Sequence, residues 1–271
     1  MSADAGIPFR LIENQVVVEI VLGGRGPFTS LVDVAVEPSV VDLALARELG
    51  LPIDATAPGE AAGQGAGSAT FYPSELRELQ IGDQLIGSVE AVAFDLASLG
   101  AKLGRPLHAI LGQSFLEGRV VQFDYGEQLL KLEPTTVAGG VSVPIEGAAD
   151  LTPVVRVTVD GREVPVVVDT GSSLTLGIYL DAVDELGLGA ERDAATPRTV
   201  TGARGEAEAY EGTVPSLALG DVRLEQVPTV FLPRAAGDPT NALGNLGNGF
   251  LRHTVLTLDY RRGRLTVRGR S

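Results

Sequence analysis

The chain repeats itself at a nearly constant spacing, and no other feature of the sequence constrains the fold as strongly. Leu31-Val32-Asp33 recurs as Val167-Val168-Asp169, and Leu111-Gly112 recurs as Leu246-Gly247. The offset between the copies changes by only one residue from the first pair to the second. A steady offset over many matched points is the pattern left by duplication of one structural unit. We therefore expect two lobes that share one fold.

The division into lobes follows the repeat. We expect a first lobe at 1–136 and a second at 137–271, joined through the Thr- and Gly-containing stretch 133–140. Each copy should also hold a short helix that ends at a glycine, Gly50 in the first and Gly187 in the second. Short apolar or alternating runs bounded by Gly, Pro and Asp predict strands. The clearest are Val16–Leu22, Val120–Phe123, Val154–Val159, Val164–Val168 and Leu265–Val267. The fold class is therefore mainly β, with each lobe curled on itself so that its strand edges are covered.

Composition excludes several classes of function. The formal net charge of −14 disfavours binding to nucleic acid or to anionic lipid. The arginines between Arg261 and Arg270 fit a solvated last strand. The chain has no cysteine and only two histidines, far apart, which disfavours thiol chemistry and His-rich metal sites. We expect no metal and no organic cofactor.

The ends of the chain and its apolar runs bear on its location. No basic stretch followed by an apolar one opens the sequence, and no apolar run is long enough to span a bilayer. We expect no membrane insertion and a cytoplasmic location for the chain as written. It would be periplasmic or secreted if an export signal had been removed.

One copy of the repeat carries Asp169-Thr170-Gly171, placed directly after the apolar run 165–168 and before Ser172-Ser173. A glycine there lets backbone N–H groups approach the carboxylate. Combined with the duplication, this motif resembles the pepsin and retropepsin superfamily of aspartic peptidases, and in particular bacterial two-lobed aspartyl proteases. The resemblance covers nearly the whole chain. It implies a two-lobed, pepsin-like fold in which each lobe is a retropepsin-like closed β-structure.

The resemblance also implies roles for individual residues. In that family each lobe presents an Asp-Thr-Gly loop backed by an apolar-apolar-Gly segment, and the two loops meet at an approximate twofold axis. The resemblance therefore makes Asp169 and Asp33 the catalytic pair. The residues that support this pair in the two loops and their backing segments are Thr170, Gly171, Val34, Ala35, Leu111, Gly112, Leu246 and Gly247. The backing segment of the first copy is Ile110-Leu111-Gly112, whereas the second copy has a polar Asn245 before Leu246.

A pair of aspartates held close together implies a specific chemistry. Two adjacent carboxylates do not both ionise readily, and the known behaviour of aspartic-protease pairs is that one keeps a proton while the other acts as a base. The base activates a water for attack on a peptide carbonyl, and the acid protonates the oxyanion. The sequence therefore predicts an aspartic endopeptidase, a hydrolase that acts on a peptide or an unfolded protein and favours acidic pH.

The first copy departs from the pattern, because Asp33-Val34-Ala35 stands where Asp-Thr-Gly is expected. The resemblance implies that the threonine hydroxyl bridges to the opposite loop, and Val34 has no hydroxyl. The Cβ of Ala35 would cost on the order of 1 kcal/mol if the backbone needs a left-handed conformation. Three hypotheses stay open. The first is a working Asp33/Asp169 pair in a monomer, which we favour. The second is a catalytically impaired pseudoprotease that binds or scaffolds peptides, and the third is a homodimer that pairs two Asp169 loops.

Two Gly-rich segments fall about 30 residues after their aspartates, a position that suits a hairpin flap over an extended substrate. Ordinary surface hairpins are the alternative. The residues concerned are Gly63, Gln64 and Gly65 in the first copy and Gly202, Ala203, Arg204 and Gly205 in the second.

Overall fold

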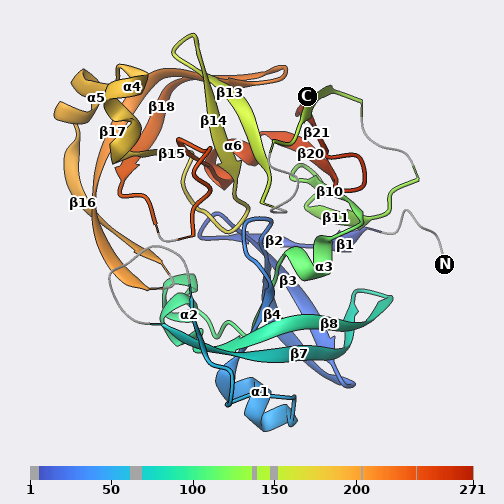
Figure 1. Ribbon diagram of the computed structural model, residues 1–271. Helices are drawn as coiled ribbons and strands as arrows, with labels where there is room; N and C mark the ends of the chain where they lie inside the picture. Colours follow the sequence, from blue (N-terminus) through green and yellow to red (C-terminus); the bar gives the residue numbers. More distant parts are fainter. Residues whose placement is uncertain are drawn as a thin grey trace.

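The computed structural model describes residues 6–61, 69–135, 139–146, 152–202, 204–235 and 237–270. Most of these residues lie in strands, which form one sheet for each half of the chain and a third sheet that both halves share (Figure 1). The predicted fold class, a mainly β protein of two repeated lobes, is confirmed. Among the described residues, no helix has the length and apolar character needed to cross a membrane.

The first lobe is an eight-stranded sheet in the order β2-β3-β4-β9-β5-β8-β7-β6. An additional pairing of β3 with β7 curls this sheet on itself. Its strands are β2 (Arg10–Ile12), β3 (Gln15–Leu22), β4 (Arg25–Val32), β5 (Ser39–Asp42), β6 (Gly59–Glu60), β7 (Thr70–Ile81), β8 (Gln84–Phe94) and β9 (Ala109–Leu111). Its helices are α1 (Leu43–Leu49), α2 (Ala97–Leu103) and α3 (Gln113–Leu116).

The second lobe is a seven-stranded sheet in the order β13-β14-β19-β15-β18-β17-β16, curled by an additional pairing of β13 with β17. Its strands are β13 (Val154–Val159), β14 (Arg162–Val168), β15 (Leu176–Tyr179), β16 (Thr196–Gly202), β17 (Gly205–Leu219), β18 (Val222–Leu232) and β19 (Gly244–Leu246). Its helical segments are η2 (Leu180–Ala182), α4 (Val183–Leu186), α5 (Gly189–Asp193) and α6 (Asn248–Leu251).

The two lobes share their central pairing pattern. In the first, β4 runs parallel to β9, β9 antiparallel to β5, and β5 parallel to β8. In the second, β14, β19, β15 and β18 are paired in the same order and with the same directions. The predicted glycine-closed helices are also present, because Gly50 ends α1 and Gly187 ends α4 in left-handed backbone with φ near 65°. Glycine takes this conformation without the steric cost of a Cβ.

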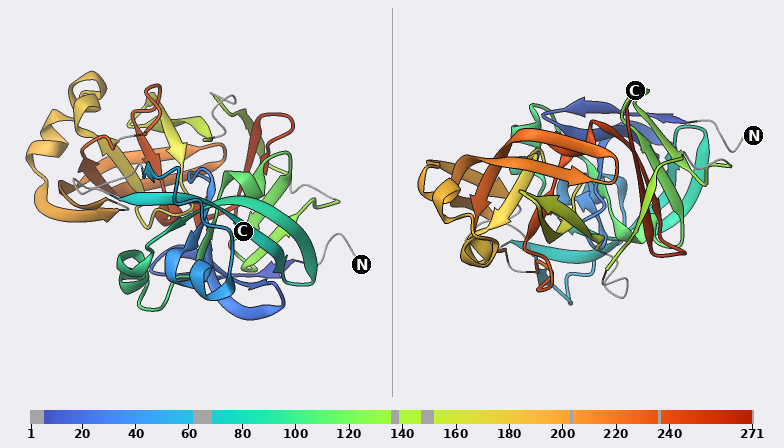
Figure 2. Two further views of the ribbon diagram at one scale, coloured as in Figure 1. Left: turned by 60° about the horizontal axis from the view of Figure 1, so that its bottom comes forward. Right: turned by 90° about the horizontal axis from the view of Figure 1, so that it is seen from above.

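The sequence did not predict the third sheet, which contains three strands from each lobe. Its order is β1-β11-β10-β20-β21-β12, and the lobes meet where β10 pairs with β20. Both views of Figure 2 show the red strands of the second lobe beside the green strands of the first. The strands are β1 (Ile7–Pro8), β10 (Val120–Asp124), β11 (Leu129–Leu132), β12 (Val141–Pro144), β20 (Thr254–Asp259) and β21 (Arg264–Gly269). The lobes are therefore joined by a continuous backbone ladder.

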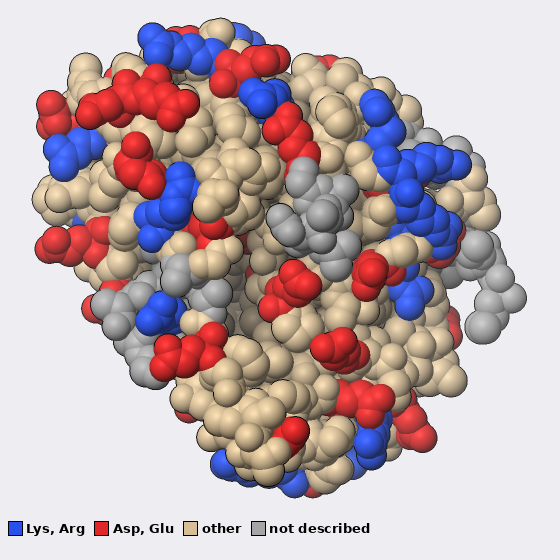
Figure 3. Space-filling model, in the orientation of Figure 1, with Lys and Arg blue, Asp and Glu red and all other residues tan. Residues whose placement is uncertain are grey.

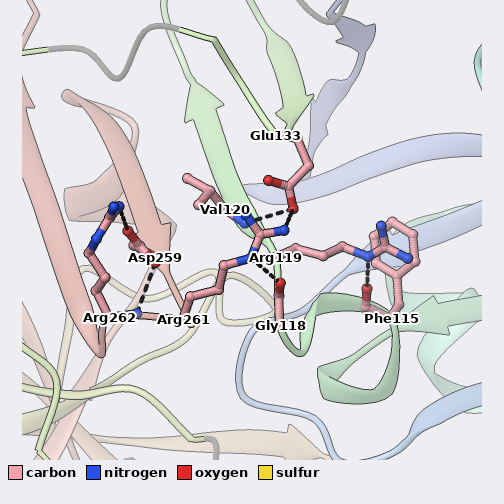
Figure 4. A network of polar contacts seen from close by, with 8 residues as sticks. All are labelled: Phe115, Gly118, Arg119, Val120, Glu133, Asp259, Arg261 and Arg262. Carbon is pink, nitrogen blue, oxygen red and sulfur yellow. Dashed lines mark hydrogen bonds and ion pairs between the residues drawn. The ribbon is translucent and has the colours of Figure 1, made fainter.

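Side chains reinforce this junction. The guanidinium of Arg261, in the turn between β20 and β21, donates to the carbonyl oxygen of Gly118 at 2.7 Å and to the carboxylate of Glu133 at 2.7 Å, both in the first lobe (Figure 4). The buried hydroxyl of Tyr125, just after β10, donates to Oδ1 of Asn248 in α6 at 2.6 Å. The Arg-rich end of the chain was expected to be a solvated strand, but Arg261 also binds the other lobe.

We expect Tyr125→Phe to lower the free energy of unfolding by about 1–2 kcal/mol, because it leaves the buried Oδ1 of Asn248 without its donor. Urea unfolding followed by circular dichroism measures this difference. Tyr72→Phe, at a half-buried position in β7, is the matched control. Equal losses in the two variants would show that the contact between the lobes contributes nothing to stability.

Candidate active site

Two loops of equivalent construction meet between the lobes. Asp33 directly follows β4, and its N–H donates to the carbonyl of Leu111 at 3.0 Å. Asp169 directly follows β14, and its N–H donates to the carbonyl of Leu246 at 3.0 Å. Each aspartate is therefore fixed at the end of a buried strand by the neighbouring parallel strand, β9 or β19.

The glycine after each of these neighbouring strands is required by close packing. A Cβ built at Gly112 would overlap the carbonyl oxygen of Val36, and one built at Gly247 would overlap the carbonyl oxygen of Leu174. In both cases the obstacle is backbone, which cannot turn aside as a side chain does. The two glycines therefore let each backing segment pack directly on the loop that carries the aspartate.

Thr170 links the two loops. Its buried hydroxyl donates to the carbonyl of Val32 at 2.8 Å and accepts a hydrogen bond from the N–H of Val34 at 3.0 Å. These two residues flank Asp33 in the opposite lobe. Val34 is fully buried in the apolar core and has no hydroxyl to make the reciprocal bonds. The cross-lobe link through hydroxyl groups therefore runs in one direction only.

The residues two positions after the aspartates hold the carboxylates in similar ways. Ala35 N–H donates to Oδ1 of Asp33 at 2.8 Å, and Gly171 N–H donates to Oδ1 of Asp169 at 3.0 Å. Ala35 is not among the residues with positive φ, so the strain that we expected from its Cβ is not present. At Gly171, in contrast, a Cβ would overlap the carboxyl group of Asp33. The Asp33 carboxyl thus lies against the loop of Asp169.

Amide side chains form a second layer beneath the loops. Gln113 in α3 donates through Nε2 to the carbonyl of Val34, and Asn248 in α6 donates through Nδ2 to the carbonyl of Thr170 at 2.6 Å. Tyr125 then bonds Asn248 from the other lobe. Sequence reasoning assigned no role to these residues. The repeat contained the signal, since an amide residue follows the backing glycine in both copies and an Asp-Tyr pair follows later in each.

The turn between β2 and β3 also reaches the opposite lobe. Gln15 donates through Nε2 to the carbonyl of Gly171 at 2.6 Å, and Asn14 donates through Nδ2 to the carbonyl of Ser173 at 3.2 Å. No sequence signal could have found these contacts, because the corresponding residues of the second copy are Asp150 and Leu151.

The surroundings of the two aspartates favour their protonated forms. Burial raises the pKa of Asp33, and hydrogen bonds from Ala35 and Gly171 offset part of this rise. Burial also raises the pKa of Asp169, and the charge of Asp33 raises it further. Two interacting carboxyl groups titrate as a pair, and raised pKa values mean that the pair keeps a proton at a higher pH than exposed aspartates do.

Comparison with known families agrees with this geometry. A model described as aspartyl protease matches residues 17–115 and 155–250. The matches fall at corresponding places in the two copies and together span more than half of the chain, and each includes one aspartate loop and its backing glycine. The chain belongs to the aspartyl protease family. A search of curated proteins found no match.

In this member of the aspartyl protease family, the β16–β17 hairpin of the second lobe reaches toward the first lobe. Gly202 and Gly205 pair at the end of the long β16–β17 hairpin, on either side of the turn that includes Arg204. The ammonium of Lys102 in α2 donates to the carbonyl of Thr201 at 2.6 Å. Figure 3 shows a hollow between the two lobes near the centre of this face. Four of the predicted flap residues, Gly63, Gln64, Gly65 and Ala203, lie outside the described residues.

Within the described part of the chain, no group of three or more His, Cys, Asp or Glu side chains is arranged to hold a metal ion. The groups that donate hydrogen bonds to the two carboxyl groups include the backbone N–H groups of Ala35 and Gly171 and the side-chain amide of Asn245. These groups can orient carboxyl groups and stabilise their charge.

Removing the Thr170 hydroxyl should destabilise the junction of the two loops. In Thr170→Val the buried Val34 N–H and Val32 carbonyl both lose their partner, and we expect a loss of about 1–3 kcal/mol in the free energy of unfolding. Thr170→Ser keeps the hydroxyl and should retain most of the stability. Chemical denaturation of the three proteins measures the difference. A Val variant as stable as the wild type would contradict the role of these bonds.

The raised pKa values predict how stability depends on pH. Because the folded pKa values of Asp33 and Asp169 lie above the unfolded value of about 3.9, their contribution is fully present below pH ~4 and is lost as pH rises through the folded values. Asp33→Asn removes one of the two charges. The melting temperature of this variant relative to the wild type should therefore increase between pH 4 and pH 8.

Calorimetry at a series of pH values measures this dependence, and Asp83→Asn, which changes an exposed aspartate in the turn between β7 and β8, is the control. Parallel curves for the wild type and Asp33→Asn would show that the burial of the pair does not affect stability.

Proposed function

We propose that the chain is an aspartic endopeptidase in which Asp33 and Asp169 together activate a water for peptide hydrolysis. The observation that carries this proposal is the cross-lobe arrangement of the two loops. The Thr170 hydroxyl binds the residues on both sides of Asp33, and the Asp33 carboxyl lies against Gly171. Asp33 is buried and Asp169 is half-buried, so two carboxyl groups from separate lobes share one environment with little exposure to water.

The proposed reaction needs one proton on the pair. The ionised carboxylate takes a proton from the water as the water oxygen attacks the peptide carbonyl carbon, and the protonated carboxyl gives its proton to the carbonyl oxygen. The tetrahedral intermediate then collapses: the carboxyl that took the proton from the water gives it to the amine nitrogen, the C–N bond breaks, and the other carboxylate takes back a proton from a hydroxyl of the intermediate. No covalent bond to the enzyme forms. The raised pKa values of both aspartates extend the singly protonated form toward higher pH than ordinary aspartates would allow.

The substrate in this proposal is an extended segment of an unfolded protein or a peptide. It would lie between the lobes and pair with strand edges through its backbone. The β16–β17 hairpin would cover such a segment, and the contact between its end and Lys102 of the first lobe supports this role. Closure by a hairpin excludes bulk solvent and orients the substrate beside the water that the pair activates, which favours the reaction.

A single chain is the form we propose. In a homodimer that pairs two Asp169 loops, the loop of a second copy would have to take the place beside Gly171 where the carboxyl of Asp33 lies. It would also have to replace the bonds that Thr170 makes to Val32 and Val34. The first-lobe loop supplies this partner within the same chain, which favours a monomer.

One observation favours the alternative of a pseudoprotease. Val34 makes no hydroxyl bond to the second lobe, so the first-lobe loop does not return the contacts that Thr170 makes. The protein would then bind extended peptides in the same cleft without cleaving them.

The test is cleavage of a denatured polypeptide between pH 3 and pH 8 by the wild type, Asp33→Asn and Asp169→Asn. We expect cleavage by the wild type that is greatest at acidic pH and declines as both aspartates ionise, together with a loss of at least about 10³-fold in each variant. Asp83→Asn is the control and should cleave like the wild type. Binding of the polypeptide by a wild type that does not cleave it would instead establish the pseudoprotease.

A further inference from the structure

Asn245 stands beside the carboxyl group of Asp169. It lies in the middle of β19, directly before Leu246 and Gly247, where the first lobe has Ile110. Its Nδ2 donates to Oδ2 of Asp169 at 3.4 Å, while the N–H of Gly171 donates to Oδ1 of the same carboxyl at 3.0 Å. Both oxygens of Asp169 are therefore held by its own lobe, and an isoleucine could not supply the second of these bonds.

The strand next to β19 provides the room for this amide. Gly177 in β15 lies opposite Asn245, and a Cβ there would overlap Oδ1 of Asn245. In the first lobe the equivalent pair is Val40 opposite Ile110, and both side chains are buried. Where the first lobe has an apolar pair, the second lobe has a glycine and an asparagine, and the glycine allows the amide to fit.

The side-chain oxygen of Asn245 is not used to bind another part of the chain that the structure describes. Oδ1 of Asn245 is buried and has no hydrogen-bond partner among the described residues. Leaving a buried polar atom unpaired costs free energy. An asparagine that served only to hold β19 in place would be expected to bond to neighbouring backbone, whereas the side-chain bond recorded for Asn245 goes to Asp169.

We infer that Asn245 is a positioning residue that fixes the orientation of the Asp169 carboxyl and stabilises its ionised form. The N–H of the amide approaches Oδ2, so the carboxyl cannot rotate without losing a hydrogen bond to one oxygen or the other. The role of Asn245 in turnover rests on the proposed function, whereas its effect on the titration of the two aspartates does not.

Other charged or titratable groups also act on Asp169. Asp33 faces it from the loop after β4, Tyr125 from the end of β10, and Tyr179 from the end of β15. Burial raises the pKa of both tyrosines well above its ordinary value, so both stay neutral where the aspartates titrate. Among the described side chains around Asp169, Asn245 is the one whose hydrogen bond lowers the pKa of this carboxyl. Its removal should therefore move the titration of the pair to higher pH.

The experiment uses Asn245→Leu, which is close in shape, and Asn245→Ala, which avoids overpacking. Carboxyl ¹³C NMR follows the titration of the two aspartates in each protein without any need for catalysis. We expect both variants to shift the titration upward by about 0.5–1 pH unit. Asn241→Leu, the same substitution at an exposed position four residues earlier, should titrate like the wild type.

Peptidase measurements on the same proteins separate positioning from binding. With an active wild type, both Asn245 variants should lower kcat by about 10-fold or more with little change in KM, and the alkaline limb of the pH profile should move in the same direction as the NMR titration. A titration unchanged in both variants would overturn the inference, even with lower activity. If the two variants show the shifted titration but the wild type has no peptidase activity, the role of Asn245 is upheld and the proposed function is rejected.

Discussion

The hydroxyl of Thr170 makes the contact on which the arrangement of the site depends. It bonds to the backbone on both sides of Asp33, and it does so from the other lobe. A shared sheet also joins the lobes, through the pairing of β10 with β20. The threonine fixes the two loops relative to each other, and because its hydroxyl is buried, water does not compete for these bonds.

The two halves of the site have diverged in what they contribute. The second lobe supplies Thr170, and it supplies Asn245 beside its own aspartate. The first lobe supports the second-lobe loop through other contacts. Gln15 donates to the carbonyl of Gly171, and Tyr125 donates to Asn248, which in turn binds the loop. A duplicated site does not have to stay symmetric, since each loop needs only enough bonds to hold its carboxylate. This accounts for a first-lobe loop that has neither the threonine nor the glycine of the second-lobe loop.

Much of the fold could be predicted from the sequence because its strongest signals are local or periodic. Gly50 and Gly187 end helices because a left-handed residue is needed there, and the apolar run before Asp169 forms a buried strand. The shared sheet could not be predicted. The mostly apolar run Val120–Phe123 predicts a strand, but nothing in that run indicates that β20 of the other lobe is its partner.

The sequence by itself determined that there are two equivalent lobes and that Asp33 corresponds to Asp169, because the repeat places both at the same point of the unit. Only the tertiary structure decided what the departures from the repeat mean. Ala35 is harmless because its backbone is not left-handed, whereas Gly171 is required because the Asp33 carboxyl lies against it. Asn245 likewise fits beside Asp169 only because Gly177 on the neighbouring strand leaves room for its side chain. Such effects depend on φ angles and on contacts between segments distant in the chain, which residue patterns do not encode.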